Sequence, residues 1–338
     1  MVARRLGLPA VLVGGPAVAF AYGVVVERRA YALRRVNLPL LPRGSPPWTI
    51  LHLSDLHLTG RDQRLATWLR RLGELEPDLV VSTGDNVAEA RALPLLATAL
   101  DPLFSRPGVF VFGSNDRYRP VRKTPWAYFS GRGRIPTGVG TLPVEALREL
   151  LASAGWHDVE ERRVVLDLPG GPVEVRGTGD AHIGRERYDL VAGPPDPAAR
   201  LVLGVTHAPY RRVLDAMTTD GVDLILAGHT HGGQVCLPGF GALTTNCDLD
   251  RRQAKGLSWW EVDSPTGSPA GRSGPVPTAP REEGRPHVLV DGGLGADLSR
   301  DRRRSALHVS AGLGTSPYAP YRFACRPEAT LLTLLPSA

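Results

Sequence analysis

The sequence predicts an α/β protein in which buried strands alternate with helices. Apolar runs of strand length recur along the chain, among them residues 48–54, 79–83 and 201–206, and each is followed by glycine, aspartate or histidine. Segments with helical spacing of apolar residues, such as residues 62–76 and 88–104, separate several of these runs. Strands joined through a helix are usually parallel, so we expect their carboxyl ends to meet at one edge of a sheet. With 338 residues, of which 42% are hydrophobic, the chain can bury a full core.

The amino-terminal segment predicts a membrane anchor. Arg4 and Arg5 precede a stretch from Leu6 to Val26 that carries no charge, and about 20 apolar residues are enough to cross a bilayer as a helix. We therefore expect residues 1–35 to form a single-pass apolar anchor in the cell membrane, and the flanking arginines favour a cytoplasmic catalytic domain. A cleaved signal peptide is one alternative. A twin-arginine export signal, which would reverse the location, is another.

Composition divides the rest of the chain. Residues 36–47 are rich in proline and are expected to form an extended connector, after which residues 48–338 form the folded domain. Within that domain, residues 264–286 are rich in Pro, Gly, Ser and Thr and lack an apolar period, which predicts a disordered insertion. The three cysteines are far apart in the sequence, which argues against a disulfide framework or a thiolate zinc site.

Aspartate and histidine side chains follow four of the predicted strands. The run at residues 224–227 ends in Gly-His-Thr-His-Gly-Gly, where the glycines let the backbone turn and approach a ligand closely. The first strand leads into Asp55 and His57, and residues two apart in an extended segment face the same side. Asp55 could instead only cap the following helix. Oxygen and nitrogen donors without thiolate suit Mn, Fe, Zn or Co. The candidate ligands are Asp55, His57, Asp85, His207, His229 and His231.

These motifs resemble the calcineurin-like metallophosphoesterase superfamily over about residues 48–335. The resemblance rests on Asp-x-His from residue 55, Gly-Asp from residue 84, Thr-His-Ala-Pro around residue 207 and Gly-His-Thr-His from residue 228. The following Gly-Gly-Gln and the apolar amino-terminal segment are most similar to its membrane-associated, YkuE-like branch. The resemblance implies two mixed β-sheets packed face to face, with helices outside.

The resemblance also implies a dinuclear metal site that hydrolyses a phosphate ester or pyrophosphate bond with metal-activated water. Two divalent ions are expected, with Mn, Fe, Zn or Co as the candidates. By motif, one ion would be held by Asp55, His57 and His231, the other by His207 and His229, with Asp85 bridging them.

One motif departs from the superfamily pattern. The usual third block is Gly-Asn-His-Asp, in which the asparagine binds the second metal and the histidine assists the leaving group, but residues 113–116 are Gly-Ser-Asn-Asp. Either Ser114 takes the ligand position, or Asn115 keeps it after a shift of one residue. We favour Asn115, because an amide oxygen is the better neutral ligand. We interpret His182 as a structural or supporting residue that can also replace the missing histidine from another strand.

Without that histidine, the site should favour substrates whose leaving group departs easily, because general acid catalysis contributes ~10²–10⁴-fold. We expect a phosphate-containing small molecule or a lipid-linked substrate. No basic and aromatic strip of the kind that binds nucleic acid is evident, so no nucleic-acid partner is expected. Arg117, Arg119 and Arg122 could clasp phosphate oxygens or form a solvated basic face. The altered block also motivates an alternative function, a catalytically impaired metal-binding protein that acts as a phosphate-ligand sensor or docking module.

Overall fold

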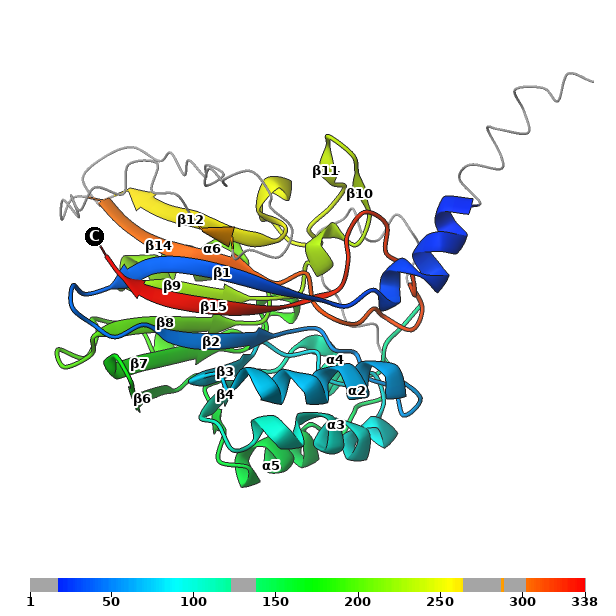
Figure 1. The fold of residues 1–338 in the computed structure, drawn as a ribbon, viewed down its shortest axis with the longest axis horizontal. Coiled ribbons are helices and arrows are strands. Elements are labelled where there is room, and N and C mark those ends of the chain that lie inside the picture. Colours follow the sequence, from blue (N-terminus) through cyan, green and yellow to red (C-terminus); the bar gives the residue numbers. More distant parts are fainter. Residues whose placement is uncertain (1–17, 123–137, 264–286, 289–301, 338) are drawn as a thin grey trace, which may run out of the picture.

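The computed structural model describes residues 18–122, 138–263, 287–288 and 302–337 (Figure 1). The expected disordered insertion at residues 264–286 lies outside the described residues.

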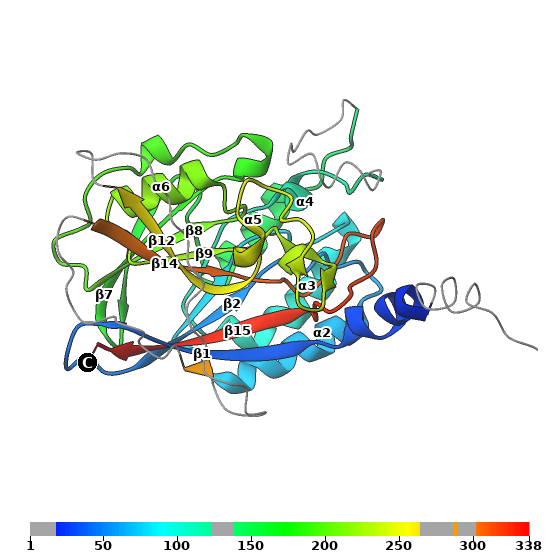
Figure 2. The same cartoon turned by 90° about the horizontal axis from the view of Figure 1, so that it is seen from above.

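Two mixed β-sheets pack face to face, and helices cover their outer faces (Figures 1 and 2). The first sheet has the order β13-β1-β15-β2-β3-β4-β5. Its strands are β1 (Ala32–Leu41), β2 (Trp48–Leu53), β3 (Leu79–Ser82), β4 (Gly108–Phe110), β5 (His157–Asp158), β13 (His287–Val288) and β15 (Glu328–Pro336). The second sheet has the order β12-β14-β9-β8-β7-β6. Its strands are β6 (Arg163–Leu168), β7 (Gly171–Thr178), β8 (Leu201–Thr206), β9 (Leu224–Ala227), β12 (Gly256–Asp263) and β14 (Arg302–Val309). The predicted pair of mixed sheets is therefore confirmed.

Apolar side chains from both sheets form the central core. Ile50 and Val81 of the first sheet lie in one cluster with Leu203 and Leu226 of the second. The strands β2, β3, β4 and β5 pair in parallel, as do β7, β8, β9 and β14. The carboxyl ends of β2 and β3 and those of β8 and β9 are thus brought to the same region of the molecule.

Helices form the two outer layers. Apolar residues of α2 (Gln63–Arg70), α3 (Leu93–Leu100) and α5 (Val144–Ser153) share a core cluster with the outer face of the first sheet. The helix α6 (Arg211–Thr219) packs in the same way on the second sheet. The helical spacing of apolar residues at 62–76 and 88–104 predicts α2 and α3, because the buried residues of such helices recur on one face. A short helix, α4 (Ser114–Arg117), follows β4, and β10 (Cys236–Leu237) and β11 (Gly241–Ala242) form a separate two-stranded sheet.

The first sheet begins earlier than the sequence suggested. Residues 32–35 were expected in the anchor and residues 36–41 in an extended connector, but they form β1, which pairs in parallel with β15. Leu38 and Leu41 of this strand are buried in the central core. Pro39 is tolerated because it lies beyond the two residues that β13 pairs with, at a shift of register.

The expectation of a single-pass anchor and of a cell-membrane location is corrected. In the described part of the chain, no helix is long and apolar enough to cross a membrane. A helix covers residues 18–25 and is followed by the 3₁₀ helix η1 (Glu27–Arg29). This segment instead packs on the domain, where the backbone amide of Arg322 donates to the carbonyl of Gly23. Residues 1–17 lie outside the described residues.

Candidate metal centre

Six candidate ligands follow the carboxyl ends of buried strands. Asp55 and His57 follow β2, Asp85 follows β3, and His207 follows β8. His229 and His231 follow β9, the latter at the start of η8 (His231–Gly233). Five of the six have a left-handed backbone, a conformation that costs energy for residues other than glycine and that is often found at functional sites. Their φ angles are 50° for Asp55, 43° for His57, 54° for Asp85, 69° for His229 and 50° for His231.

The first donor group consists of Asp55, His57 and His231. Oδ1 of Asp55 is buried and has no hydrogen-bond partner among the described residues. It lies 3.6 Å from Nε2 of His231 and 4.0 Å from Nε2 of His57, and the two Nε2 atoms are 3.1 Å apart. Oδ2 of Asp55 is fixed by bonds from the Ser54 hydroxyl (2.6 Å) and the His229 amide (2.9 Å). One carboxylate oxygen and two imidazoles therefore converge on one position.

The second donor group consists of Asp55, Asp85 and His207. Nε2 of His207 lies 3.5 Å from Oδ2 of Asp85 and has no hydrogen-bond partner within the described ranges. Nδ1 of His207 is 2.7 Å from the carbonyl oxygen of Thr83, to which it can donate. Such a bond fixes the ring and leaves Nε2 as the ligand atom. Oδ2 of Asp85 is also 3.5 Å from Nε2 of His57, so it lies between the two groups.

Two further histidines lie beside the second group. The rings of His229 and His207 have centroids 5.3 Å apart, and those of His229 and His182 are 4.2 Å apart. Nε2 of His229 is 3.2 Å from the carbonyl oxygen of Asn246. In the tautomer that donates to this carbonyl, Nδ1 of His229 carries the lone pair for a metal. His182 belongs to the 3₁₀ helix η6 (Ala181–Ile183), and its Nδ1 is 3.1 Å from the hydroxyl of Tyr210.

Asn115 of the altered block forms hydrogen bonds with the second donor group. Its backbone amide donates to Oδ1 of Asp85 (2.7 Å), and its side-chain amide donates to Oδ2 of Asp85 (2.6 Å). The hydroxyl of Ser114 is 3.5 Å from that side-chain amide. Asn115 is therefore the residue of the pair whose side chain bonds to Asp85.

The buried carboxylates and imidazoles of the centre shift one another's pKa values. Burial lowers the pKa of His207, but Asp85, Asp180 and Asp55 outweigh it and raise that pKa to about 10. Burial and neighbouring imidazoles hold the pKa values of His229 and His231 well below the usual value, so these rings stay neutral, as metal ligands must.

Close backbone approach is essential to the centre. A Cβ on Gly113 would lie 2.1 Å from Oδ1 of Asp85, and one on Gly228 would lie 1.8 Å from the hydroxyl of Ser54. Together with the unpartnered donor atoms of Asp55 and His207, this packing shows that the residues present fit divalent metal ions.

Asp116, which the sequence analysis did not single out, holds the loops in place. Its carboxylate is buried and accepts bonds from the backbone amides of Asp85 (2.7 Å), Asn86 (2.7 Å) and Gly113 (3.0 Å). It thereby joins the loop after β3 to the altered block. Its position as the last residue of that block was the available signal.

The sequence did not predict a role for Arg322 in the centre, because this arginine belongs to no recognisable motif. Its guanidinium is fully buried and donates to the carbonyl oxygens of Ala311 (2.8 Å) and Gly314 (2.7 Å). It also lies 3.3 Å from Nδ1 of His231. By contrast, Arg117, expected to clasp phosphate or to be solvated, forms a largely buried ion pair with Glu160.

Comparisons with known proteins place this chain in a family of phosphoesterases. The calcineurin-like phosphoesterase family model matches residues 49–233, which contain every candidate site residue. Phosphodiesterase YaeI of Escherichia coli (strain K12) is 30% identical over 249 residues, or 71% of this chain and 80% of that protein. The uncharacterized metallophosphoesterase YkuE of Bacillus subtilis (strain 168) is 26% identical over 221 residues, or 62% and 67%. Among solved structures, purple acid phosphatase PPD1 from yellow lupin (Lupinus luteus) covers 66% of this chain and 40% of its own at 12% identity, with a TM-score of 0.35, too low to support an argument.

Proposed function

Because the chain belongs to the calcineurin-like phosphoesterase family, we propose that it hydrolyses a phosphate ester or pyrophosphate bond with two divalent metal ions. Mn, Fe, Zn or Co suit the donor set of carboxylates and imidazoles. When bound, such ions activate a water molecule and stabilise the charge that develops on the phosphoryl group.

The observation that carries this proposal is the position of Asp85 between the two donor groups. Its Oδ2 atom is 3.5 Å from Nε2 of His57 and 3.5 Å from Nε2 of His207. A shared carboxylate between two sets of ligands is what a dinuclear centre requires. Asp55, His57 and His231 would hold one ion, and His207, His229 and Asn115 the other, with Asp85 common to both.

The surrounding residues orient these ligands. The carbonyl of Thr83 fixes the ring of His207, and Asp116 fixes the backbone that carries Asp85. His182 is the alternative source of the proton that the altered block does not supply, because its ring lies against that of His229 at the edge of the second group.

We propose that the substrate is a diester or a pyrophosphate with an easily displaced leaving group. The altered block at residues 113–116 has no histidine to protonate a poor leaving group. The relative YaeI is named a phosphodiesterase, which supports the diester.

The test uses the full chain, stripped of metal and reloaded with Mn²⁺, on bis(p-nitrophenyl) phosphate and p-nitrophenyl phosphate. Hydrolysis should depend on Mn²⁺ and should fall on the order of 10³-fold in Asp85→Asn, because each ion supplies several kcal/mol of charge stabilisation. The matched control is Asp167→Asn, which changes an exposed carboxylate on β6 and should retain activity. Metal-independent hydrolysis, or equal rates in the two variants, would contradict the proposal.

A second function is motivated by the altered block. If the chain binds two Mn²⁺ ions but turns over neither these esters nor a pyrophosphate, it is a phosphate-ligand sensor or docking module that retains the fold and the metals without catalysis.

A further inference from the structure

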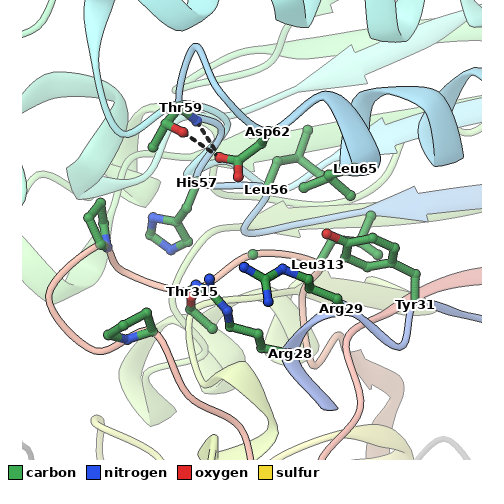
Figure 3. Close-up of a pocket in the computed structure, with 13 residues that line it drawn as sticks. Arg28, Arg29, Tyr31, Leu56, His57, Thr59, Asp62, Leu65, Leu313 and Thr315 are labelled. Atoms are coloured by element: carbon green, nitrogen blue, oxygen red, sulfur yellow. Dashed lines mark hydrogen bonds between the residues drawn. The ribbon is translucent and has the colours of Figure 1, made fainter. Parts of the chain in front are cut away.

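A pocket with a volume of about 280 Å³ opens beside the metal centre (Figure 3). Its walls come from η1 and the residues that follow it, from the loop between β2 and α2, and from the segment before β15. His57 lines the pocket and also belongs to the first donor group. A molecule bound at the metal centre can therefore extend into this pocket.

Two adjacent arginines, Arg28 and Arg29, extend into the pocket opposite His57 and Asp62 (Figure 3). Nε of Arg28 is buried without a hydrogen-bond partner in the described part of the chain. Arg29 donates from Nη1 to the carbonyl oxygen of Val25 at 3.0 Å. The pKa of Arg28 is lowered by burial and by the positive charge of Arg29. Two positive charges therefore lie close together, which is energetically unfavourable, and a bound anion would offset this repulsion.

The Asp62 carboxylate in the pocket wall offsets only part of these charges, and its own charge acts to raise the pKa of Arg28. Oδ2 of Asp62 accepts bonds from the backbone amide (2.8 Å) and the hydroxyl (2.6 Å) of Thr59, so Asp62 mainly holds its own loop. One carboxylate against two guanidinium groups leaves a positive pocket. A polar hydroxyl at Thr315 and apolar walls at Leu65 and Leu313 complete it.

Hydrogen bonds hold the segment that contains Arg28 and Arg29 in place. Glu27, which precedes them, is buried, and its carboxylate accepts bonds from the backbone amides of Ala324 (3.0 Å) and Cys325 (2.7 Å). On the other side, Nε of Arg326 donates to the carbonyl oxygen of Ala30 at 2.9 Å. Because η1 is tied to the segment before β15 at both ends, the pocket is preorganised for its ligand.

We propose that this arginine pocket, defined by Arg28, Arg29, Tyr31, His57 and Thr315, binds a second phosphate group of the substrate, beyond the bond that is cleaved. The inference rests on the proposed function, since the metal centre supplies the site for the first phosphate. A planar guanidinium can bind two phosphate oxygens at once. The volume is near the lower end for ligand pockets, ~300 Å³, and suits a phosphate with a few neighbouring atoms. The substrate class narrows to phosphoesters or pyrophosphates that carry a further phosphate.

The test compares two activated diesters on the Mn²⁺-loaded full chain: thymidine 5′-(p-nitrophenyl phosphate) and the same ester with a phosphate on its 3′ hydroxyl. Wild type should show kcat/KM about tenfold or more higher for the phosphorylated ester, because hydrogen bonds to charged groups contribute ≈1.5–3 kcal/mol each. In Arg28→Gln/Arg29→Gln this preference should disappear. A double lysine variant, Arg28→Lys/Arg29→Lys, should keep part of it, because the charge remains.

Arg71→Gln is the matched control, because Arg71 is an exposed arginine on η2 (Arg71–Leu75), and it should keep the full preference. Equal kcat/KM values for the two esters in wild type, or an unchanged preference in the double glutamine variant, would overturn the arginine pocket while leaving the phosphoesterase intact.

A second measurement separates the pocket from the proposed function if neither ester is hydrolysed. Inorganic pyrophosphate is titrated calorimetrically into the metal-free full chain, where it has no ion to chelate and the carboxylates of the metal centre repel it. Binding that is about tenfold or more weaker in the double glutamine variant supports the pocket, again from the strength of charged hydrogen bonds. Absent binding, or equal binding in both proteins, overturns it.

Discussion

The Asp55–His57–His231 group and the Asp55–Asp85–His207 group both contain Asp55, and Asp85 of the second group also lies next to the first, but the hydrogen bonds of their other donors differ. In the first group, the carboxylate oxygen and the two Nε2 atoms all lie within 4.0 Å of one another. In the second, His207 is fixed by the carbonyl of Thr83. Beside the second group, the side-chain amide of Asn115 donates to Asp85, and Nε2 of His229 lies 3.2 Å from the carbonyl oxygen of Asn246, which leaves Nδ1 of His229 for a metal.

This difference falls where the sequence departs from the superfamily pattern. The first group has no hydrogen bond from the block at residues 113–116 among the described residues, whereas Asn115 of that block donates to Asp85 of the second group. Asn115 would bind an ion through the neutral Oδ1 atom of its amide, from a position shifted by one residue from the superfamily pattern. We therefore expect the first ion to be held more tightly than the second.

The largest effect should come from His231→Asn, which removes a proposed ligand of the first ion. Asparagine tolerates the left-handed backbone at this position, where φ is 50°. We expect kcat to fall on the order of 10³-fold, because an ion supplies several kcal/mol of stabilisation, and Asn115→Ala to cost less. Metal analysis and kcat with Mn²⁺ on bis(p-nitrophenyl) phosphate test both variants.

The control for this comparison is His157→Asn, an exposed histidine on β5 that should leave activity and metal content unchanged. If Asn115→Ala lost as much activity and metal as His231→Asn, the expectation that the first ion is held more tightly than the second would be wrong.

Restoring the usual third block should reduce the difference between the two donor groups. In Ser114→Asn/Asn115→His, residues 113–116 become Gly-Asn-His-Asp. We expect hydrolysis of esters with poor, alkyl leaving groups to increase by about 10²-fold, the lower end of general acid catalysis. The dependence of rate on leaving-group pKa measures this, and it should become shallower than in wild type.

Rates for alkyl esters that stay at the wild-type level in the restored block, with metal content unchanged, would mean that another residue already supplies the proton. His182 is then the side chain to change, as His182→Asn, and the dependence on leaving-group pKa should steepen.

The smallest effect concerns pH. The pKa of His207 is raised to about 10, so in the metal-free protein this ring carries a proton at pH 7 that an ion at Nε2 must displace. Affinity for the second ion should therefore rise with pH, about tenfold between pH 7 and 8, because the ligand must lose its proton. His231, whose pKa is well below the usual value, is already neutral at pH 7, so it adds no pH dependence to the first ion.

Calorimetric titration of the metal-free chain with Mn²⁺ at pH 7 and pH 8 resolves this difference. An equal pH dependence for both ions would mean that the same proton is lost when either ion binds. It would contradict the expectation that only the second ion displaces a proton from His207.

The sequence by itself determined the α/β class, the positions of most helices and strands, and the candidate ligands. These features are local, because apolar periodicity and the residue at a strand end depend on neighbours in the chain. The superfamily resemblance added the two packed mixed sheets, which the structure confirms, and Asp55, His57 and His231 lie together as the motifs implied.

Only the tertiary structure decided the rest. The apolar content of the amino-terminal segment gave no sign that residues 32–41 would pair with the last strand, since strand pairing depends on what edge the finished sheet offers. Arg322 and the arginine pocket escaped the sequence analysis because their partners come from distant segments. A buried cation is stabilised by carbonyls and carboxylates that only packing brings together, so no local pattern encodes it.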